Sequence, residues 1–384
     1  MHPITPTIIL ATALLLPISV SGKPGPGPKP DRQITYKTIG GKELKLHVFN
    51  PAPDTPKPMP AIVFFFGGGW SGGTPSQFYH QGKYLAGQGV LAISAEYRTK
   101  RNGGVEPSEC VKDGKAAIRY VRQHARELGV DPDRIAAGGG SAGGHVAAAT
   151  GTVRGFEHDD EDLTISSRPN AMVLFNPVYD NSKNGYGHAR VKDYWKEFSP
   201  LHNLDKDTPP AIVFFGSKET LVKRPAMEAF QAGMEEFGTT SVLKVYDGPG
   251  HGFFNHGRDD NKWFLLTMTE SHEFLGDLGW IEGDPAVDAY LGKPLDAPDR
   301  APTALFDGKT LNGWSVLKCE AEANDGTILI TAGNGLVQSK KMYGDFILEF
   351  EWKKLAADNW DSGVYFRYDS VPPKRPWPAT ITLP

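Results

Sequence analysis

Several short stretches of the sequence are almost wholly hydrophobic, and glycine, proline or polar residues bound each of them. A strand that is buried on both faces of a sheet has this character, because neither face meets water. The stretches that we assign to such strands are 61–66, 90–95, 171–175 and 211–215. Shorter strands are expected at 134–137 and 242–246. The sequence therefore predicts a sheet with a buried centre.

Helical periodicity occupies the segments between these strands. From Val111 to Leu128, hydrophobic residues recur at steps of three, four and seven, and the helix-ending residue Gly129 follows, so we expect one helix over 107–129. Further helices are expected at 145–150, 224–237 and 260–278. Strands that alternate with helices form a mostly parallel sheet with helices on both faces. The fold class predicted for residues 34–282 is therefore α/β.

The pattern changes at residues 283–302, where proline and aspartate cluster and helical periodicity ends. Every second position from Phe346 to Trp352 is a large hydrophobic residue, and 364–368 repeat the pattern, which is typical of half-buried antiparallel strands. We expect 283–302 to be a linker and 303–384 to be a β-sandwich. Because a compact sandwich needs roughly 100 residues, this segment would be a partial one.

The N-terminal end has the features of a secretory signal. Residues 8–20 are mostly apolar and small residues follow, whereas a membrane span needs about 20 apolar residues. We expect a signal peptide at 1–22, export from the cytoplasm, and no stable membrane insertion after cleavage. The segment 23–33, rich in proline and glycine, is expected to be a linker. The two cysteines, Cys110 and Cys319, fall in different predicted domains, so we expect no disulfide between them.

Composition narrows the possible partners. The 384 residues include 41 Lys and Arg against 45 Asp and Glu, a net charge of −4. Such a balance provides no basic surface for nucleic acid, so we expect no nucleic-acid partner. The chain also contains 44 glycines and 31 prolines, above their usual shares of about 7% and 5%. Its glycine clusters are therefore candidates for turns or for close approach of the backbone to a ligand.

The motif glycine–X–serine–X–glycine occurs twice, around Ser71 and around Ser141. A nucleophilic serine on a sharp turn needs a strand before it, a helix after it and small neighbours. Ser141 meets these requirements, because it lies between the expected strand at 134–137 and the expected helix at 145–150. Ser71 is followed by the loop-forming residues 72–75. Ser141 is therefore the predicted nucleophile.

A serine that attacks a carbonyl group creates an oxyanion, which backbone N–H groups must stabilise. We expect one donor from Ala142, the residue after the nucleophile. Other donors are expected from Gly68 and Gly69, in the glycine cluster that ends the strand at 61–66. The alternative interpretation of this cluster is a plain turn at the end of a strand.

The histidine and the acid of a serine triad are expected late in the chain. His251 lies on a loop after the strand at 242–246, which makes it the predicted general base. Glu219 follows the strand at 211–215 and is the predicted acid that orients the histidine. Asp180 follows the preceding strand and is kept as the alternative acid.

Residues 34–281 resemble α/β-hydrolases of the hormone-sensitive-lipase and feruloyl- or acetylxylan-esterase type. The motifs that carry the resemblance are FFGGGW at 65–70, PDRIAAGGGSAGGH at 132–145, GSKE at 216–219 and GHGFF at 250–254. Their order, serine then acid then histidine, is that of the family. The resemblance implies an exported serine esterase that forms an acyl-enzyme and needs no cofactor and no metal. Two positions depart from the family, which usually has histidine in place of Phe66 and aspartate in place of Glu219.

Residues 303–384 resemble the first part of 3-keto-disaccharide hydrolase domains, which have a concanavalin-like jelly-roll fold. The matching motifs are LFDGKTLNGW at 305–314, YGDFILEFEW at 343–352 and DSGVYFRY at 361–368. We assign no site residue in this segment. The two resemblances together imply small esters, or acyl esters linked to carbohydrate, as substrates.

Other interpretations stay open. The same triad could serve a peptidase, and a carbohydrate-binding protein could contain an inert hydrolase core. The acidic segment 158–162 could bind calcium, but it lacks regular ligand spacing, so a solvated loop is favoured. Five aromatic residues between two strands could line a substrate site or simply pack a loop: Tyr179, Tyr186, Tyr194, Trp195 and Phe198.

Overall fold

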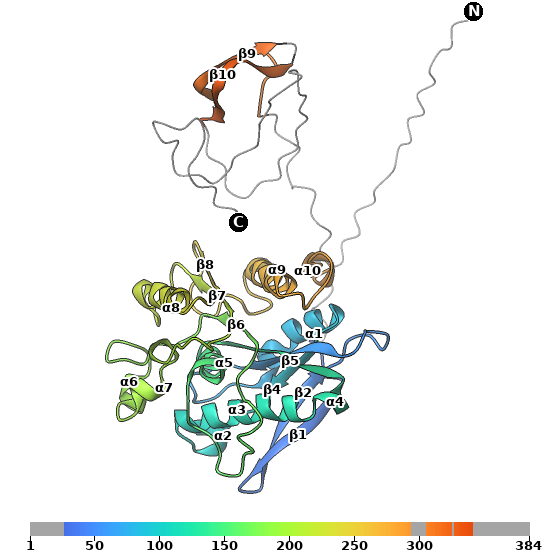
Figure 1. The fold of residues 1–384 in the computed structure, drawn as a ribbon, viewed down its shortest axis with the longest axis vertical. Coiled ribbons are helices and arrows are strands. Elements are labelled where there is room, and N and C mark those ends of the chain that lie inside the picture. The colour runs from blue at the N-terminus through green and yellow to red at the C-terminus, as the bar shows by residue number, and fades with distance from the viewer. Residues whose placement is uncertain (1–26, 293–304, 325, 341–384) are drawn as a thin grey trace, which may run out of the picture. The chain divides into compact units, whose positions relative to one another are not determined.

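The computed structural model describes residues 27–292, 305–324 and 326–340 (Figure 1). The chain divides into two compact units, Met1–Lys293 and Pro294–Pro384. The predicted signal peptide at 1–22 lies outside the described residues. In the part of the chain that the structure describes, no helix has both the length and the apolar character that a membrane span requires.

An eight-stranded sheet forms the centre of the first unit, in the order β1-β2-β4-β3-β5-β6-β7-β8. β1 and β2 form an antiparallel hairpin and β2 pairs antiparallel with β4, whereas the other neighbouring strands are parallel. The strands are β1 (Arg32–Ile39), β2 (Lys42–Phe49), β3 (Met59–Phe65), β4 (Leu91–Ala95), β5 (Val130–Gly140), β6 (Ala171–Phe175), β7 (Ala211–Gly216) and β8 (Ser241–Tyr246). The prediction of a mostly parallel α/β sheet is confirmed.

Helices cover both faces of this sheet (Figure 1). Side chains alternate between the faces of a strand: Val63 and Phe65 of β3 join the core beside α3, α5 and α8, whereas Ile62 and Phe64 join the core beside α1 and α9. The helices are α1 (Tyr79–Gly87), α2 (Lys100–Gly103), α3 (Pro107–Gln123), α4 (Ala125–Leu128), α5 (Ala142–Thr152), α6 (His188–Val191), α7 (Trp195–Phe198), α8 (Arg224–Glu236), α9 (Lys262–Asp277) and α10 (Val287–Tyr290). Short 3₁₀ turns are η1 (Pro75–Phe78), η2 (Pro200–His202) and η3 (Asp259–Asn261).

The prediction of one helix over 107–129 is wrong in one respect. The helix breaks at His124, whose φ of −97° and ψ of 18° end α3, and α4 then continues to Leu128. Gly129 ends α4 with a left-handed φ of 69°, as the sequence predicted. The hairpin β1–β2 and the helix α1 were not predicted.

The described part of the second unit is a two-stranded antiparallel ribbon of β9 (Trp314–Asn324) and β10 (Thr327–Ser339). Along β9, half-buried and exposed positions alternate from Val316 onward, as on one face of a sheet. The strands predicted at 346–352 and 364–368 lie outside the described residues. The structure records both cysteines, Cys110 and Cys319, with free thiols.

Candidate active site

Ser141 lies between the end of β5 and the start of α5, in a backbone conformation that non-glycine residues rarely adopt (φ 56°, ψ −120°). Its N–H donates to the carbonyl oxygen of Phe175, at 3.0 Å. The turn is closely packed: a Cβ atom at Gly139 would lie 2.4 Å from the carbonyl oxygen of Gly143, and one at Gly143 would lie 2.1 Å from that of Phe65. The structure therefore has the strand, sharp turn and helix that a nucleophilic serine needs.

Ser141, His251 and Glu219 form a continuous chain of hydrogen bonds. Nε2 of His251 lies 2.8 Å from Oγ of Ser141, and Nδ1 of His251 lies 2.6 Å from Oε2 of Glu219. These residues follow the carboxyl ends of β5, β8 and β7, and parallel pairing brings those ends to one edge of the sheet. The alternative acid, Asp180, is not part of the chain, since its Oδ1 accepts the N–H of Ser182 at 2.9 Å.

Glu219 is held as a carboxylate. Its side chain is 0% exposed, whereas that of His251 is 24% exposed. Burial raises the pKa of Glu219, but the hydrogen bonds from His251 and from the N–H of Leu221 (2.7 Å to Oε1) outweigh burial and hold the pKa below its ordinary value. A charged carboxylate beside Nδ1 fixes the tautomer in which Nε2 can accept a proton.

The glycine cluster after β3 lies directly against the serine. A Cβ atom at Gly67 would be 3.2 Å from Cβ of Ser141. Gly68 and Gly69 have φ values of 126° and 62°, which favour glycine. Among the described residues, the N–H groups of Gly68, Gly69 and Ala142 have no protein acceptor. The three predicted oxyanion donors are thus unpaired and lie on the serine turn and the glycine loop beside it.

Three amide side chains that the sequence analysis did not single out also reach this region. Oδ1 of Asn176 accepts the N–H of Gly252 at 2.9 Å, and its Nδ2 lies 3.4 Å from Nε2 of His251. Gln77 and Asn255 are hydrogen-bonded to each other at 3.0 Å. Amide side chains have no characteristic sequence spacing, so the sequence contained no signal for them.

The second serine motif belongs to the glycine loop. Ser71 Oγ donates to the carbonyl oxygen of Gly69 at 3.2 Å. Nη1 of Arg190 donates to the same oxygen at 2.6 Å, and the guanidinium carbon lies 4.8 Å from the centre of the Trp70 ring. The hydroxyl of Tyr186 would lie 2.8 Å from a Cβ atom at Gly69. The insertion between β6 and β7, which carries Arg190 and Tyr186, therefore packs onto this loop.

The aromatic residues of that insertion mostly pack its interior. Tyr179 stacks on Phe230, with 4.4 Å between ring centres, and Phe198 stacks on His145 at 4.2 Å, all of them buried. Burial lowers the pKa of His145 to about 3, so this ring stays neutral. Three partly buried members pack against the same core: Tyr186, Tyr194 and Trp195. Two of the five contact the glycine loop: Tyr186 lies against Gly69, and the ring centre of Phe198 lies 5.8 Å from that of Trp70.

The acidic segment 158–162 forms ion pairs with neighbouring elements. Asp160 Oδ1 and Glu161 Oε1 each lie 2.6 Å from Nζ of Lys37 in β1. Glu161 also pairs with Arg119 in α3, at 3.1 Å. These contacts attach the segment to the body of the unit, so it is more than the solvated loop that the sequence favoured.

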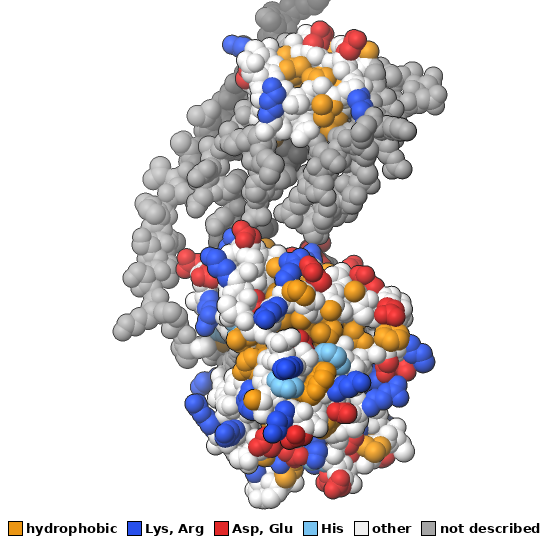
Figure 2. Space-filling view, turned by 90° about the vertical axis from the view of Figure 1, so that its left-hand side faces the viewer, with side chains coloured by type: hydrophobic (Ala, Val, Ile, Leu, Met, Phe, Trp, Pro, Cys, Tyr) orange, Lys and Arg blue, Asp and Glu red, His pale blue; other side chains and the backbone are white. Residues whose placement is uncertain are grey.

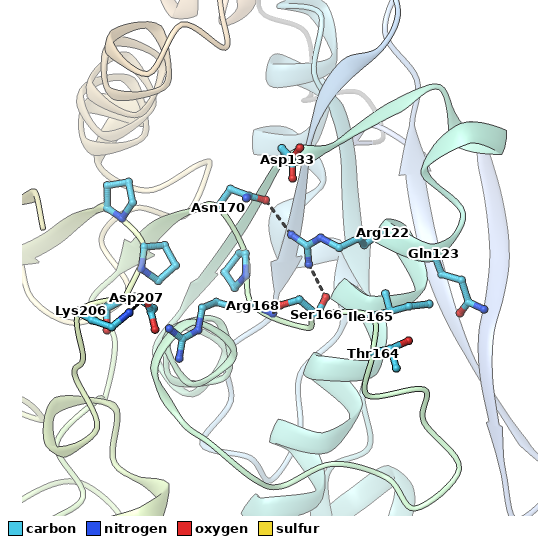
Figure 3. Close-up of a pocket in the computed structure, with 14 residues that line it drawn as sticks. Arg122, Gln123, Asp133, Thr164, Ile165, Ser166, Arg168, Asn170, Lys206 and Asp207 are labelled. Carbon is cyan, nitrogen blue, oxygen red and sulfur yellow. Dashed lines mark hydrogen bonds and ion pairs between the residues drawn. The ribbon is translucent and has the colours of Figure 1, made fainter.

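A hollow of about 820 Å³ lies at the amino ends of β6 and β7 (Figure 3). Arg122 lines this hollow, and its guanidinium group donates to the carbonyl oxygen of Ser166 at 2.5 Å and to Oδ1 of Asn170 at 2.8 Å. Arg168 pairs with Asp205 at 3.0 Å. This hollow is at the opposite edge of the sheet from Ser141, so it is not part of the triad site.

A smaller hollow, about 330 Å³, borders His251 itself. Its other lining residues are Gly250, Phe253, Arg258 and Asp259. One face of this unit shows hydrophobic and histidine side chains gathered in the middle, with charged side chains around them (Figure 2). The hollow beside His251 borders the base of the triad, whereas Ser141 and the glycine loop do not line it.

Comparisons with known proteins identify two families and several esterases. Residues 46–182 match the BD-FAE family, and residues 301–382 match the 3-keto-alpha-glucoside-1,2-lyase-like domain. Esterase LipQ of Mycobacterium tuberculosis is 26% identical over 242 residues, which cover 56% of this chain and 56% of LipQ. Esterase LipC of the same organism is 26% identical over 218 residues, 51% of this chain and 54% of LipC. The chain thus spans about half the length of these curated relatives.

A solved structure is more similar. The apo form of Thermogutta terrifontis esterase 2 is 42% identical, with a TM-score of 0.63, over 66% of this chain and 96% of that chain. The similarity covers nearly all of that esterase and includes both sequence and fold. The chain therefore belongs to the α/β-hydrolase esterase family.

Proposed function

We propose that this protein hydrolyses carboxylic esters through an acyl-enzyme on Ser141. The observation that carries the proposal is the chain of hydrogen bonds from Ser141 through His251 to Glu219. A hydroxyl, an imidazole and a buried carboxylate in this order form the constellation that activates serine toward carbonyl carbon. The relatives named esterase support the same reaction class.

In the first half of the reaction, Ser141 Oγ attacks the ester carbonyl carbon while Nε2 of His251 accepts the hydroxyl proton. The negative charge that develops on the carbonyl oxygen is stabilised by the N–H groups of Gly68, Gly69 and Ala142. Glu219 stabilises the imidazolium that forms. When the tetrahedral intermediate collapses, the bond to the alcohol oxygen breaks and Nε2 returns its proton to that oxygen.

In the second half, water replaces the alcohol. Nε2 of His251 accepts a proton from the water as its oxygen attacks the acyl carbon on Ser141. Collapse of the second tetrahedral intermediate breaks the bond to Oγ and releases the acid, while Nε2 returns the proton to Oγ. The cycle is balanced by these residues and water, with no metal and no cofactor.

The acyl group that we propose is short. The proposal is supported by structures of Thermogutta terrifontis esterase 2, 41% identical to this chain, that are described as propionate bound and butyrate bound. An alcohol part linked to carbohydrate is supported by the match of residues 301–382 to a 3-keto-alpha-glucoside-1,2-lyase-like domain. Export, supported by the apolar segment 8–20, would place the enzyme where such polymers occur.

The first test is the variant Ser141→Ala, assayed on p-nitrophenyl acetate and butyrate. Loss of the nucleophile in other serine triads lowers kcat by about 10⁶, and we expect a loss of that order here. Ser166→Ala, at the opposite edge of the sheet, is the matched control and should keep wild-type kcat. Full activity of Ser141→Ala would show that Ser141 is not the nucleophile.

A panel of substrates separates ester hydrolysis from the rival functions. We expect turnover of the p-nitrophenyl esters and of acetylated xylan or methyl ferulate, but not of peptide p-nitroanilides. Paraoxon, which is the phosphorylating agent in one structure of Thermogutta terrifontis esterase 2, should label the wild type and not Ser141→Ala. Glycan binding without turnover and without label would favour an inert core instead.

A further inference from the structure

Two amide side chains bridge the glycine loop and the histidine loop. Oε1 of Gln77 accepts the N–H of Gly67 at 2.6 Å. Nε2 of Gln77 donates to Oδ1 of Asn255 at 3.0 Å, and Nδ2 of Asn255 donates to the carbonyl oxygen of Gly252 at 2.7 Å. The chain Gly67–Gln77–Asn255–Gly252 therefore runs from one side of the nucleophile to the other.

The orientation of both amides follows from the backbone groups at the two ends. An N–H can only donate, so Gln77 must face Gly67 with its oxygen and Asn255 with its nitrogen. A carbonyl oxygen can only accept, so Asn255 must face Gly252 with its nitrogen and Gln77 with its oxygen. Rotating either amide by 180° would break two hydrogen bonds, which makes the bridge a single specified arrangement.

Both ends of the bridge are next to residues of the proposed chemistry. Gly67 precedes the donor Gly68, and a Cβ atom on Gly67 would lie 3.2 Å from Cβ of Ser141. Gly252 follows His251, and its own N–H donates to Asn176. The bridge therefore binds the backbone next to the oxyanion donor Gly68 at one end and next to the base His251 at the other.

Each amide residue of the bridge is adjacent in sequence to a fully buried phenylalanine. Gln77 lies in η1 beside Phe78, which is fully buried and stacks on Phe64 at 4.8 Å and on Phe254 at 5.6 Å. Asn255 directly follows Phe254, which is also fully buried. Packed aromatic neighbours on both sides limit how far either amide can move.

Gln77 also determines which N–H groups are available to an oxyanion. Because the Gly67 N–H donates to Gln77, it is not available to an oxyanion, whereas the N–H groups of Gly68 and Gly69 are. Phe66, which precedes Gly67, is held by the Tyr97 hydroxyl, which donates to its carbonyl oxygen at 2.5 Å.

Given the proposed esterase function, we infer that Gln77 and Asn255 are positioning residues that fix the oxyanion donors relative to His251. They touch no substrate, and they act through the backbone of Gly67 and Gly252. Misplacement of catalytic groups by about 1 Å can cost about 100-fold in rate. Loss of the bridge should therefore lower kcat and leave substrate binding nearly unchanged.

The test compares Gln77→Leu, Asn255→Leu and the double variant on p-nitrophenyl butyrate. We expect each single variant to lose roughly 10- to 100-fold in kcat, with KM within about threefold of wild type. The double variant should lose no more than the worse single variant, because residues of one network are not additive. Ser76→Ala, in the same turn and exposed, is the matched control and should behave as wild type.

Gln77→Glu keeps the test decisive if the leucine variants fold poorly. Its oxygen can still accept the Gly67 N–H but cannot donate to Asn255, so kcat should fall between wild type and Gln77→Leu. The inference is overturned if folded Gln77→Leu and Asn255→Leu keep kcat within about twofold of wild type, or if their losses multiply in the double variant. Absence of turnover by the wild type would instead defeat the proposed function itself.

Discussion

Ser141 has a φ of 56°, a backbone conformation that is energetically unfavourable for serine. The packing around Ser141 must therefore hold it in this conformation. A Cβ atom at Gly140 would lie 2.2 Å from Cζ of Phe254, and one at Gly143 would overlap backbone oxygens of β3. These glycines are sterically required, which is why the cluster at 138–144 could be recognised from the sequence. The positions of Asn176 and Gln77 depend on contacts between distant loops, so the sequence could not indicate them.

The assignment of the acid is tested by the pair Glu219→Gln and Asp180→Asn. Glutamine keeps the size of Glu219 but removes the charge that orients His251, so kcat should fall by about 10⁴, as in other serine triads. Asp180→Asn should leave kcat close to wild type, because the side chain of Asp180 accepts a local turn hydrogen bond from the N–H of Ser182 and is not bonded to His251. Steady-state kinetics on p-nitrophenyl butyrate measures both. A larger loss from Asp180→Asn would transfer the role to Asp180.

Four strands at the centre of the sheet could be predicted to within two residues because every position in them is buried, whereas β5, which has exposed positions near its start, extends over Val130–Gly140 instead of the predicted 134–137. β3, β4, β6 and β7 have no exposed position, so their sequences are continuous hydrophobic runs. β1 lies at the edge of the sheet with several exposed positions, and its polar sequence gave no such run. In α1, Gly82 weakens the helical signal, yet a Cβ atom there would lie 3.0 Å from Phe49. Tertiary packing requires that glycine against its helix propensity.

Packing between α3 and α5 gives a prediction on stability. Glycine in a helix is normally about 1 kcal/mol less stable than alanine. At Gly114, however, a Cβ atom would lie 2.4 Å from Cγ1 of Val146 in α5. We expect Gly114→Ala to lower the free energy of unfolding by roughly 1–3 kcal/mol, since overpacking costs that much.

The matched control for this variant is Gly87→Ala at the end of α1, where a Cβ atom would meet nothing within 4 Å. That variant should be neutral or stabilised by up to about 1 kcal/mol. Urea denaturation of the two variants beside wild type measures both changes. Equal effects at the two sites would show that helix propensity, and not the contact with α5, decides the outcome.

At the scale of the molecule, the composition of the chain predicts where its two units are divided. The sequence indicated a linker over 283–302, and the compact units meet at Lys293 and Pro294. Residues 283–292 belong to the first unit, where α10 inserts Val287 into the core beside α9. A four-residue helix is too short to show periodicity, so composition alone suggested a linker there.

The first unit should therefore be an independent catalyst. Both hydrophobic cores of the described residues lie between Tyr36 and Val287, and the triad lies within the same span. A chain that ends at Lys293 should melt at the temperature of the main transition of the full chain and hydrolyse p-nitrophenyl butyrate with kcat/KM within about twofold of it. If residues 301–382 bind carbohydrate, the same truncation should raise KM for acetylated xylan while small esters are unaffected. Calorimetry and steady-state kinetics on the full and the truncated chain measure these effects. An equal loss of kcat/KM on both substrates would contradict the expectation. It would mean that the second unit supports the fold or the triad and does not select the substrate.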